Sequence, residues 1–206
     1  MRTLRLARSR SELQPVLFLV AGLVLFLGAH SVRIIADPWR SAMVARLGPL
    51  RWRGLYSLVS LAGLVLLIWG YGHARADPVL LWSPPVWTRY ATSLLMLPSL
   101  VLIVAGNMSG TRMKVALGHP MLLGTLLWAL AHLLSNGTLA DIVLFGGFLV
   151  WAGVDYRSAR QRDRAAGTIY PPGTLNRDAI AVFIGSVAWI IFVFWLHQLL
   201  IGVRPF

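Results

Sequence analysis

Residues 13–32 read LQPVLFLVAGLVLFLGAHSV, a run without Asp, Glu, Lys or Arg. An α-helix of about 20 apolar residues spans the roughly 30 Å of hydrocarbon in a bilayer. Three further uncharged runs, at residues 54–72, 90–111 and 179–203, are of similar or greater length. The chain therefore contains at least four segments that are long enough to cross a membrane as helices.

The segment 115–154 predicts one more pair of helices. Asp141 is the single charged residue in this segment, and Asn136-Gly137 divides it. Asn and Gly both tolerate positive φ and favour turns. We therefore predict an all-α fold, a polytopic transmembrane helix bundle with about six transmembrane helices. Their expected positions are about residues 14–35, 55–71, 90–106, 120–134, 138–154 and 179–201.

Two elements outside these spans are expected near the N-terminus. Residues 1–13 contain four Arg and form a basic N-terminal extension ahead of a transmembrane domain at residues 14–203. The apolar run after this extension is longer than the 7–15 residues of a signal-peptide core, so we expect the first helix to be retained. Residues 39–47 predict a short interfacial helix, with Asp37 as its cap and Pro38 in its first turn.

The charge of the chain is strongly positive, with 19 Lys and Arg against 7 Asp and Glu and a formal net charge of +12. The arginines lie between apolar segments, as in residues 155–178, which we expect to form a basic soluble loop. Such a distribution orients a membrane protein, so no nucleic acid is expected as a partner. With six helices, seven basic residues lie on the side of the two termini and twelve lie on the opposite side. Because basic loops favour the cytoplasmic side, this count favours both termini outside, whereas the four N-terminal arginines favour the reverse orientation.

Histidines are the residues of this chain that point to a site. His30, His119, His132 and His197 lie within or at the end of predicted spans, where an ionisable side chain is costly without a partner. The chain has no cysteine, which excludes thiolate ligands. His119 and His132 lie about 20 Å apart along one helix, so they cannot bind one metal ion. We expect His30 and His119 at one depth of the membrane, and His132 and His197 at the other.

Two imidazoles from separate helices are the usual means of holding haem within a membrane protein. Haem suits neutral imidazole without carboxylate or thiolate, whereas a zinc site needs three or four protein ligands. We therefore predict that His30 and His119 bind haem iron, with His132 as a further cofactor-binding candidate. The alternative is that these histidines only form hydrogen bonds between helices.

Several motifs resemble the NnrU family of bacterial membrane proteins. They are Gly28-Ala29-His30-Ser31-Val32-Arg33, Gly118-His119-Pro120 and Trp128-Ala129-Leu130-Ala131-His132, followed by Asn136-Gly137. The resemblance covers almost all of the chain beyond the first dozen residues. It implies a multi-pass protein of the bacterial inner (cytoplasmic) membrane. The family is linked to the expression of nitrite and nitric oxide reductases in denitrifying bacteria.

The resemblance also implies a cofactor. The plant relative, zeta-carotene isomerase, uses haem b bound through histidines to isomerise a carotenoid double bond. Carried over by motif, the ligand candidates are His30 and His119, and His132 is the remaining one. Besides the lipid bilayer, the partners implied are a small apolar substrate and a membrane protein. Whether the chain is an enzyme is left open.

The sequence departs from the family pattern at Gly118, where relatives commonly have Arg before His-Pro. Arg-His-Pro also occurs in membrane methyltransferases of the isoprenylcysteine type, where it helps hold the methyl donor, so the departure weakens that alternative. It also removes a partner for a haem propionate, a role for which Arg33 and Arg112 are candidates. A non-enzymatic membrane partner protein is the third interpretation.

Overall fold

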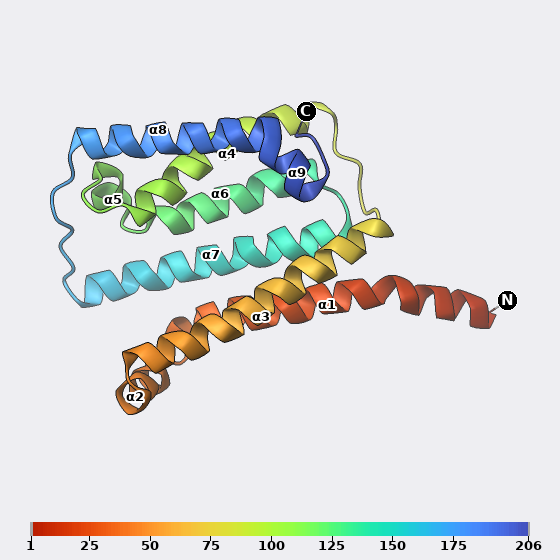
Figure 1. Ribbon diagram of the computed structural model, residues 1–206, viewed down its shortest axis with the longest axis horizontal. Helices are drawn as coiled ribbons and strands as arrows, with labels where there is room; N and C mark the ends of the chain where they lie inside the picture. The colour runs from red at the N-terminus through yellow and green to blue at the C-terminus, as the bar shows by residue number, and fades with distance from the viewer. Residues whose placement is uncertain (1, 206) are drawn as a thin grey trace. The chain divides into compact units, whose positions relative to one another are not determined.

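The computed structural model describes residues 2–205, with side chains from residue 14 onward. The described chain is helical, as predicted (Figure 1). Its elements are α1 (Arg2–Ile35), α2 (Asp37–Leu47), α3 (Pro49–Ala76), α4 (Trp87–Asn107), α5 (Arg112–Leu117), α6 (Pro120–Ser135), α7 (Leu139–Ala165), α8 (Leu175–Ile191), a π-helical segment η1 (Phe192–Leu196) and α9 (His197–Ile201).

All six predicted spans correspond to helices. Among the described residues, five helical stretches are long and apolar enough to cross a membrane. These are Gln14–Ile35, Pro49–Ala76, Trp87–Asn107, Leu139–Ala165 and Leu175–Ile201. The remaining span, α6, is apolar but has only 16 residues, fewer than the about 20 that a full crossing needs. The chain is a membrane protein built from helices.

Several boundaries differ from those that we expected. α7 continues to Ala165 and α8 begins at Leu175, so most of residues 155–178 is helical and the loop is confined to residues 166–174. The extension of α7 consists mainly of Arg, Ala and Gln, which favour helix strongly. At the N-terminus, α1 begins at Arg2, so residues 2–13 of the basic segment are helical and continuous with the first span.

Two local predictions were wrong in detail. The N-cap of α2 is Ala36, and Asp37 is instead the first helical residue. The turn between α6 and α7 lies at Asn136-Gly137 as predicted, but neither residue has positive φ. Glycine is needed there because a Cβ on Gly137 would overlap the carbonyl oxygen of Trp82. The requirement is therefore a close backbone approach and not a left-handed conformation.

The described chain divides into two compact units. The first contains residues 1–82 and 137–147, and the second contains residues 83–136 and 148–206. α7 contributes residues 139–147 to the first unit and the remainder to the second.

The first unit is organised by a helix pair, α1 and α3, which lie side by side (Figure 1). A Cβ added to Gly63 would lie 2.6 Å from the backbone nitrogen of Phe26, and one added to Gly70 would lie 2.5 Å from that of Leu19. Small residues at such crossings let membrane helices pack closely. The two spans therefore make direct backbone contact along a glycine-lined face.

Buried hydroxyl groups help to hold the second unit together, in which α4 packs against both α6 and α8. Ser99 donates a hydrogen bond to the carbonyl oxygen of Gly124 at 2.8 Å, and Thr92 donates to that of Ala131 at 2.7 Å. Both bonds join α4 to α6. In an apolar environment these polar groups must be satisfied within the protein, so the bonds fix how the two helices pack.

Candidate functional site

Four polar side chains meet in the second unit where α6 begins and α7 ends. We refer to His119, Arg160, Asp163 and Tyr170 as the Asp163 cluster. His119 Nε2 lies 2.9 Å from Asp163 Oδ2, and the Tyr170 hydroxyl donates to the same oxygen at 2.6 Å. Arg160 Nη1 lies 3.8 Å from that oxygen. One carboxylate oxygen therefore faces a histidine, a phenol and a guanidinium group.

Helical spacing explains why α7 supplies this cluster. Tyr156, Arg160 and Asp163 are four and three residues apart, so they project from one face of the helix. The Tyr156 hydroxyl donates to the carbonyl oxygen of Leu117 at 3.0 Å, which ties this face of α7 to the end of α5. The same face therefore presents Asp163 to His119, which directly precedes α6.

Gly118 shapes the backbone beside His119. Its φ of +74° is a conformation that L side chains rarely adopt. A Cβ at this position would also crowd the Arg160 side chain, whose Cδ would lie 3.2 Å away and whose guanidinium end would have to shift. The arginine expected immediately before His-Pro is absent from the sequence, but Arg160 brings a guanidinium group to the same place from α7.

Partial burial and hydrogen bonding to Asp163 raise the pKa of Tyr170 to about 12. The phenol is therefore protonated at neutral pH and acts as a donor. The side chains of His119 and Asp163 are 31% and 17% exposed, so solvent reaches the cluster. Because an ionised carboxylate only accepts hydrogen bonds, His119 Nε2 is the donor to Asp163, and whenever the ring is neutral its lone pair is on Nδ1.

His30 has different surroundings in the first unit. Its Nδ1 lies 2.7 Å from the carbonyl oxygen of Phe26, one turn earlier in α1. Its ring centroid lies 4.4 Å from that of Phe26 and 5.3 Å from that of Tyr56 on α3. A carbonyl oxygen can only accept, so Nδ1 is the donor, and whenever the ring is neutral Nε2 holds the lone pair.

The family of this chain is decided by sequence comparison. The family model described as NnrU protein matches residues 18–205. The chain belongs to the NnrU family. Neither the curated proteins nor the solved structures contain a significant match to it. The matched region of this NnrU-family chain includes His30, His119 and His132, and also the whole Asp163 cluster.

The other predicted site residues of the NnrU-family chain lie apart from these two histidines. His132 is in the last turn of α6, and its Nδ1 lies 2.9 Å from the carbonyl oxygen of Trp128. His197 Nδ1 lies 2.6 Å from the carbonyl oxygen of Val203. Arg112 opens α5 and is exposed. His119 and His132 therefore occupy opposite ends of α6, in agreement with the helical rise.

The predicted ligands are divided between the two units. Arg33 and His30 belong to the first unit, whereas His119, His132 and Arg112 belong to the second. Arg33 Nε lies 3.9 Å from Asp37 Oδ1. Because neither unit by itself contains both His30 and His119, their pairing around one haem stays a prediction.

Sequence reasoning missed Arg160, Asp163 and Tyr170. It interpreted residues 155–165 as a loop because they are polar, although Tyr156, Arg160 and Asp163 already have helical spacing. That spacing was the available signal for two of the three residues. Tyr170 lies in the true loop, 51 positions from His119, and no local pattern places it.

Proposed function

We propose that this NnrU-family protein binds haem b in a bacterial inner membrane through His30 and His119, with His132 as the further candidate ligand. The observation that carries the proposal is the hydrogen bond between His119 and Asp163, because a carboxylate partner on one ring nitrogen is typical of metal-binding histidines. The backbone-carbonyl partner of His30 orients its ring but is of a kind shared by His73, His132 and His197. His30 donates to a backbone carbonyl at 2.7 Å, and His119 donates to a carboxylate at 2.9 Å. Histidines that bind metals usually have such a partner on the other ring nitrogen, which fixes the tautomer and the ring orientation.

The donor set also fits haem better than a metal ion held by protein alone. Among the described residues, no group of three or more His, Cys, Asp or Glu side chains is placed to hold a metal ion. Haem supplies four porphyrin nitrogens itself, so it needs only one or two imidazoles from the chain. Bound haem would supply a redox-active iron.

The residues of the Asp163 cluster would have distinct tasks in such a site. Asp163 orients the His119 ring, and Tyr170 holds the carboxylate from the loop side. Arg160 joins Arg33 and Arg112 as a candidate partner for a haem propionate, because its guanidinium group lies beside Gly118 and Asp163. Guanidinium groups bind carboxylates well through several donors.

Two roles are compatible with a haem-binding member of this family. We propose first that the protein supports the expression or maturation of nitrite and nitric oxide reductases in denitrification. The second candidate is haem-dependent cis–trans isomerisation of a small apolar substrate.

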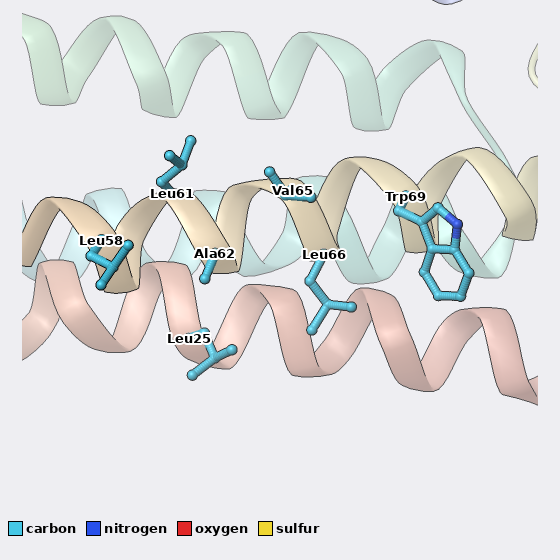
Figure 2. Close-up of a pocket in the computed structure, with 7 residues that line it drawn as sticks. All are labelled: Leu25, Leu58, Leu61, Ala62, Val65, Leu66 and Trp69. Atoms are coloured by element: carbon cyan, nitrogen blue, oxygen red, sulfur yellow. The ribbon is translucent and has the colours of Figure 1, made fainter.

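An apolar groove supports the second candidate. It lies on α1 and α3 in the same unit as His30 and has a volume of about 560 Å³ (Figure 2). Its lining residues are Leu25, Leu58, Leu61, Ala62, Val65, Leu66 and Trp69. The groove is shallow and has no charged side chain in its lining, so it suits a hydrocarbon chain, that of a membrane lipid as well as that of an apolar substrate.

The visible spectrum of the purified full-length protein tests haem binding. We expect a Soret band, and a pyridine haemochrome spectrum of haem b. His73→Ala should keep the Soret band and is the control for His30→Ala. His73 Nδ1 also lies near a backbone carbonyl oxygen, that of Trp69 at 2.9 Å, but His73 is not a candidate ligand. A protein that remains colourless after reconstitution with haem contradicts the proposal. Binding of the methyl donor S-adenosylmethionine by such a colourless protein would support the methyltransferase alternative.

A deletion strain separates the two roles. In a denitrifying host, loss of the gene should lower nitrite reductase activity, and the wild-type gene should restore it whereas the His119→Ala gene should not. Unchanged nitrite and nitric oxide reductase activities in the deletion strain would contradict the denitrification role.

A further inference from the structure

The connection between α1 and α3 has a strongly positive surface. Over residues 33–53 the chain has five arginines and one acidic residue, Asp37, a net charge of +4 (5 − 1). We call these arginines the arginine collar; they are Arg33, Arg40, Arg46, Arg51 and Arg53. Asp37 Oδ1 lies 3.9 Å from Arg33 and 3.6 Å from Arg40. Within the described part of the chain, the other three arginines form no ion pair, so most of the positive charge of the collar is uncompensated.

Large apolar side chains are exposed beside the collar. Ile35, Leu50 and Trp39 are 81%, 80% and 53% exposed, and α2 buries none of its residues. Trp39 also contacts Trp52 at the start of α3, with ring centroids 5.8 Å apart. Exposure of this kind is unfavourable in water but favourable at the boundary between acyl chains and headgroups, where tryptophan is enriched.

The position of α2 in the fold places it at this boundary. α1 and α3 both contain segments long and apolar enough to span a membrane, and α2 joins the end of one to the start of the other. The collar therefore begins where both helices leave the hydrocarbon. Arginines and apolar side chains at this level give α2 a composition suited to the interface between headgroups and acyl chains.

We propose that the arginine collar binds the phosphate groups of anionic phospholipids, while Ile35, Trp39 and Leu50 insert at the level of the upper acyl chains. The chemistry favours this occupant over a soluble acidic protein, because the positive and apolar groups alternate along one short segment that adjoins two spans. Guanidinium groups match phosphate oxygens through paired donors. The inference does not depend on haem binding.

Titration of the full-length protein in neutral detergent with phosphatidylglycerol, followed by native mass spectrometry, tests the proposal. Phosphatidylcholine with the same acyl chains provides the neutral comparison. Each basic residue near an anionic lipid surface contributes about fivefold in affinity. Arg46→Gln, Arg51→Gln and Arg53→Gln combined should therefore weaken phosphatidylglycerol binding at least tenfold and leave phosphatidylcholine binding unchanged.

The matched control removes three exposed arginines from the second unit, through Arg157→Gln, Arg164→Gln and Arg177→Gln. It changes the net charge by the same amount, and we expect less than a twofold effect. If the two triple variants lose the same affinity for phosphatidylglycerol, the effect comes from net charge alone and the proposal is wrong. It is also wrong if the collar variant binds phosphatidylglycerol as tightly as the wild type. Circular dichroism and gel filtration verify that both variants are folded.

Salt and a tryptophan variant supply independent readouts. Raising NaCl from about 50 to about 500 mM should weaken phosphatidylglycerol binding to the wild type, because the interaction is screened. The collar variant should lose most of this salt dependence, because only Arg33 and Arg40 of the collar remain. Trp39→Ala should weaken the binding of both lipids, because it removes an apolar anchor and no charge. A salt-independent wild type would contradict the role of the arginines.

Discussion

His30 and His119 are the two predicted haem ligands, and the structure holds them by different means. His30 is oriented by a carbonyl of its own helix and by aromatic rings. His119 is oriented by a carboxylate from another helix, which in turn contacts a phenol and a guanidinium group. The position of His30 therefore depends mainly on local helix geometry. That of His119 depends on a tertiary network, which single substitutions can dismantle.

The largest difference between the two sites should appear at their neighbouring glycines. Gly118→Ala should destabilise the protein by about 1–3 kcal/mol, because a positive φ is unfavourable for alanine and the end of the Arg160 side chain has to move aside. Gly28→Ala is the matched change beside His30. No atom lies within 4 Å of a Cβ at that position, so alanine should be neutral or stabilising by up to about 1 kcal/mol. Thermal unfolding in detergent measures the stability of both variants. Equal changes in stability would contradict the predicted difference between the His119 and His30 sites.

Asp163→Ala should have the next largest effect. It leaves the His119 Nε2–H and the Tyr170 hydroxyl without their acceptor, at a cost of about 2 kcal/mol. Asp155→Ala on the same helix is the control, because Asp155 makes a single ion pair, with Arg162 at 3.5 Å. That change should cost about 1 kcal/mol or less. If Asp163→Ala and Asp155→Ala have the same thermal unfolding midpoint, Asp163 does not organise the cluster.

Tyr170→Phe sharpens the comparison further. It removes a hydrogen bond to the Asp163 carboxylate and a longer one, of 3.3 Å, with His119 Nε2, and it should cost about 1–2 kcal/mol at neutral pH. The loop from residue 166 to residue 174 should also become more accessible to proteolysis, because its anchor on Asp163 is lost. A variant with wild-type stability and wild-type cleavage would show that the phenol is dispensable.

The smallest effect should be a pH dependence of the stability difference between the wild type and Tyr170→Phe. The pKa of Tyr170 is raised from its ordinary value of 10 to about 12, so the folded state favours the protonated phenol. Its contribution to stability is complete below pH 10 and is lost as the pH rises from 10 to about 12. The gap between wild type and Tyr170→Phe should therefore be constant from about pH 7 to 9 and shrink above 10. A gap that widens with rising pH would contradict the assigned direction.

Much of the fold could be predicted because spanning a membrane imposes a length and a composition. Long uncharged runs located the spanning helices, and Asn136-Gly137 located the connection of α6 and α7. Two limits are instructive. The polarity of residues 155–165 concealed a helix that extends past the apolar part of α7. The role of Gly137 depends on Trp82, which is distant in sequence and cannot be identified from a turn propensity.

The candidate site was less predictable than the fold. Histidines inside apolar segments were visible in the sequence, and so was the separation of His119 from His132 on one helix. The partner of His119 was not, because Asp163 is 44 positions away and a carboxylate on a polar segment usually faces water. The difference is physical: a span is determined locally, whereas a hydrogen-bond network is determined by which helix ends meet.

The visible spectra of three single-histidine variants test the central claim most directly. His30→Ala, His119→Ala and His132→Ala are purified in parallel and loaded with haem b under the same conditions. We expect His30→Ala and His119→Ala each to shift or abolish the Soret band, and His132→Ala to retain it. Unchanged spectra for the first two variants, with loss of the band in His132→Ala, would contradict the assignment of His30 and His119 as the ligands.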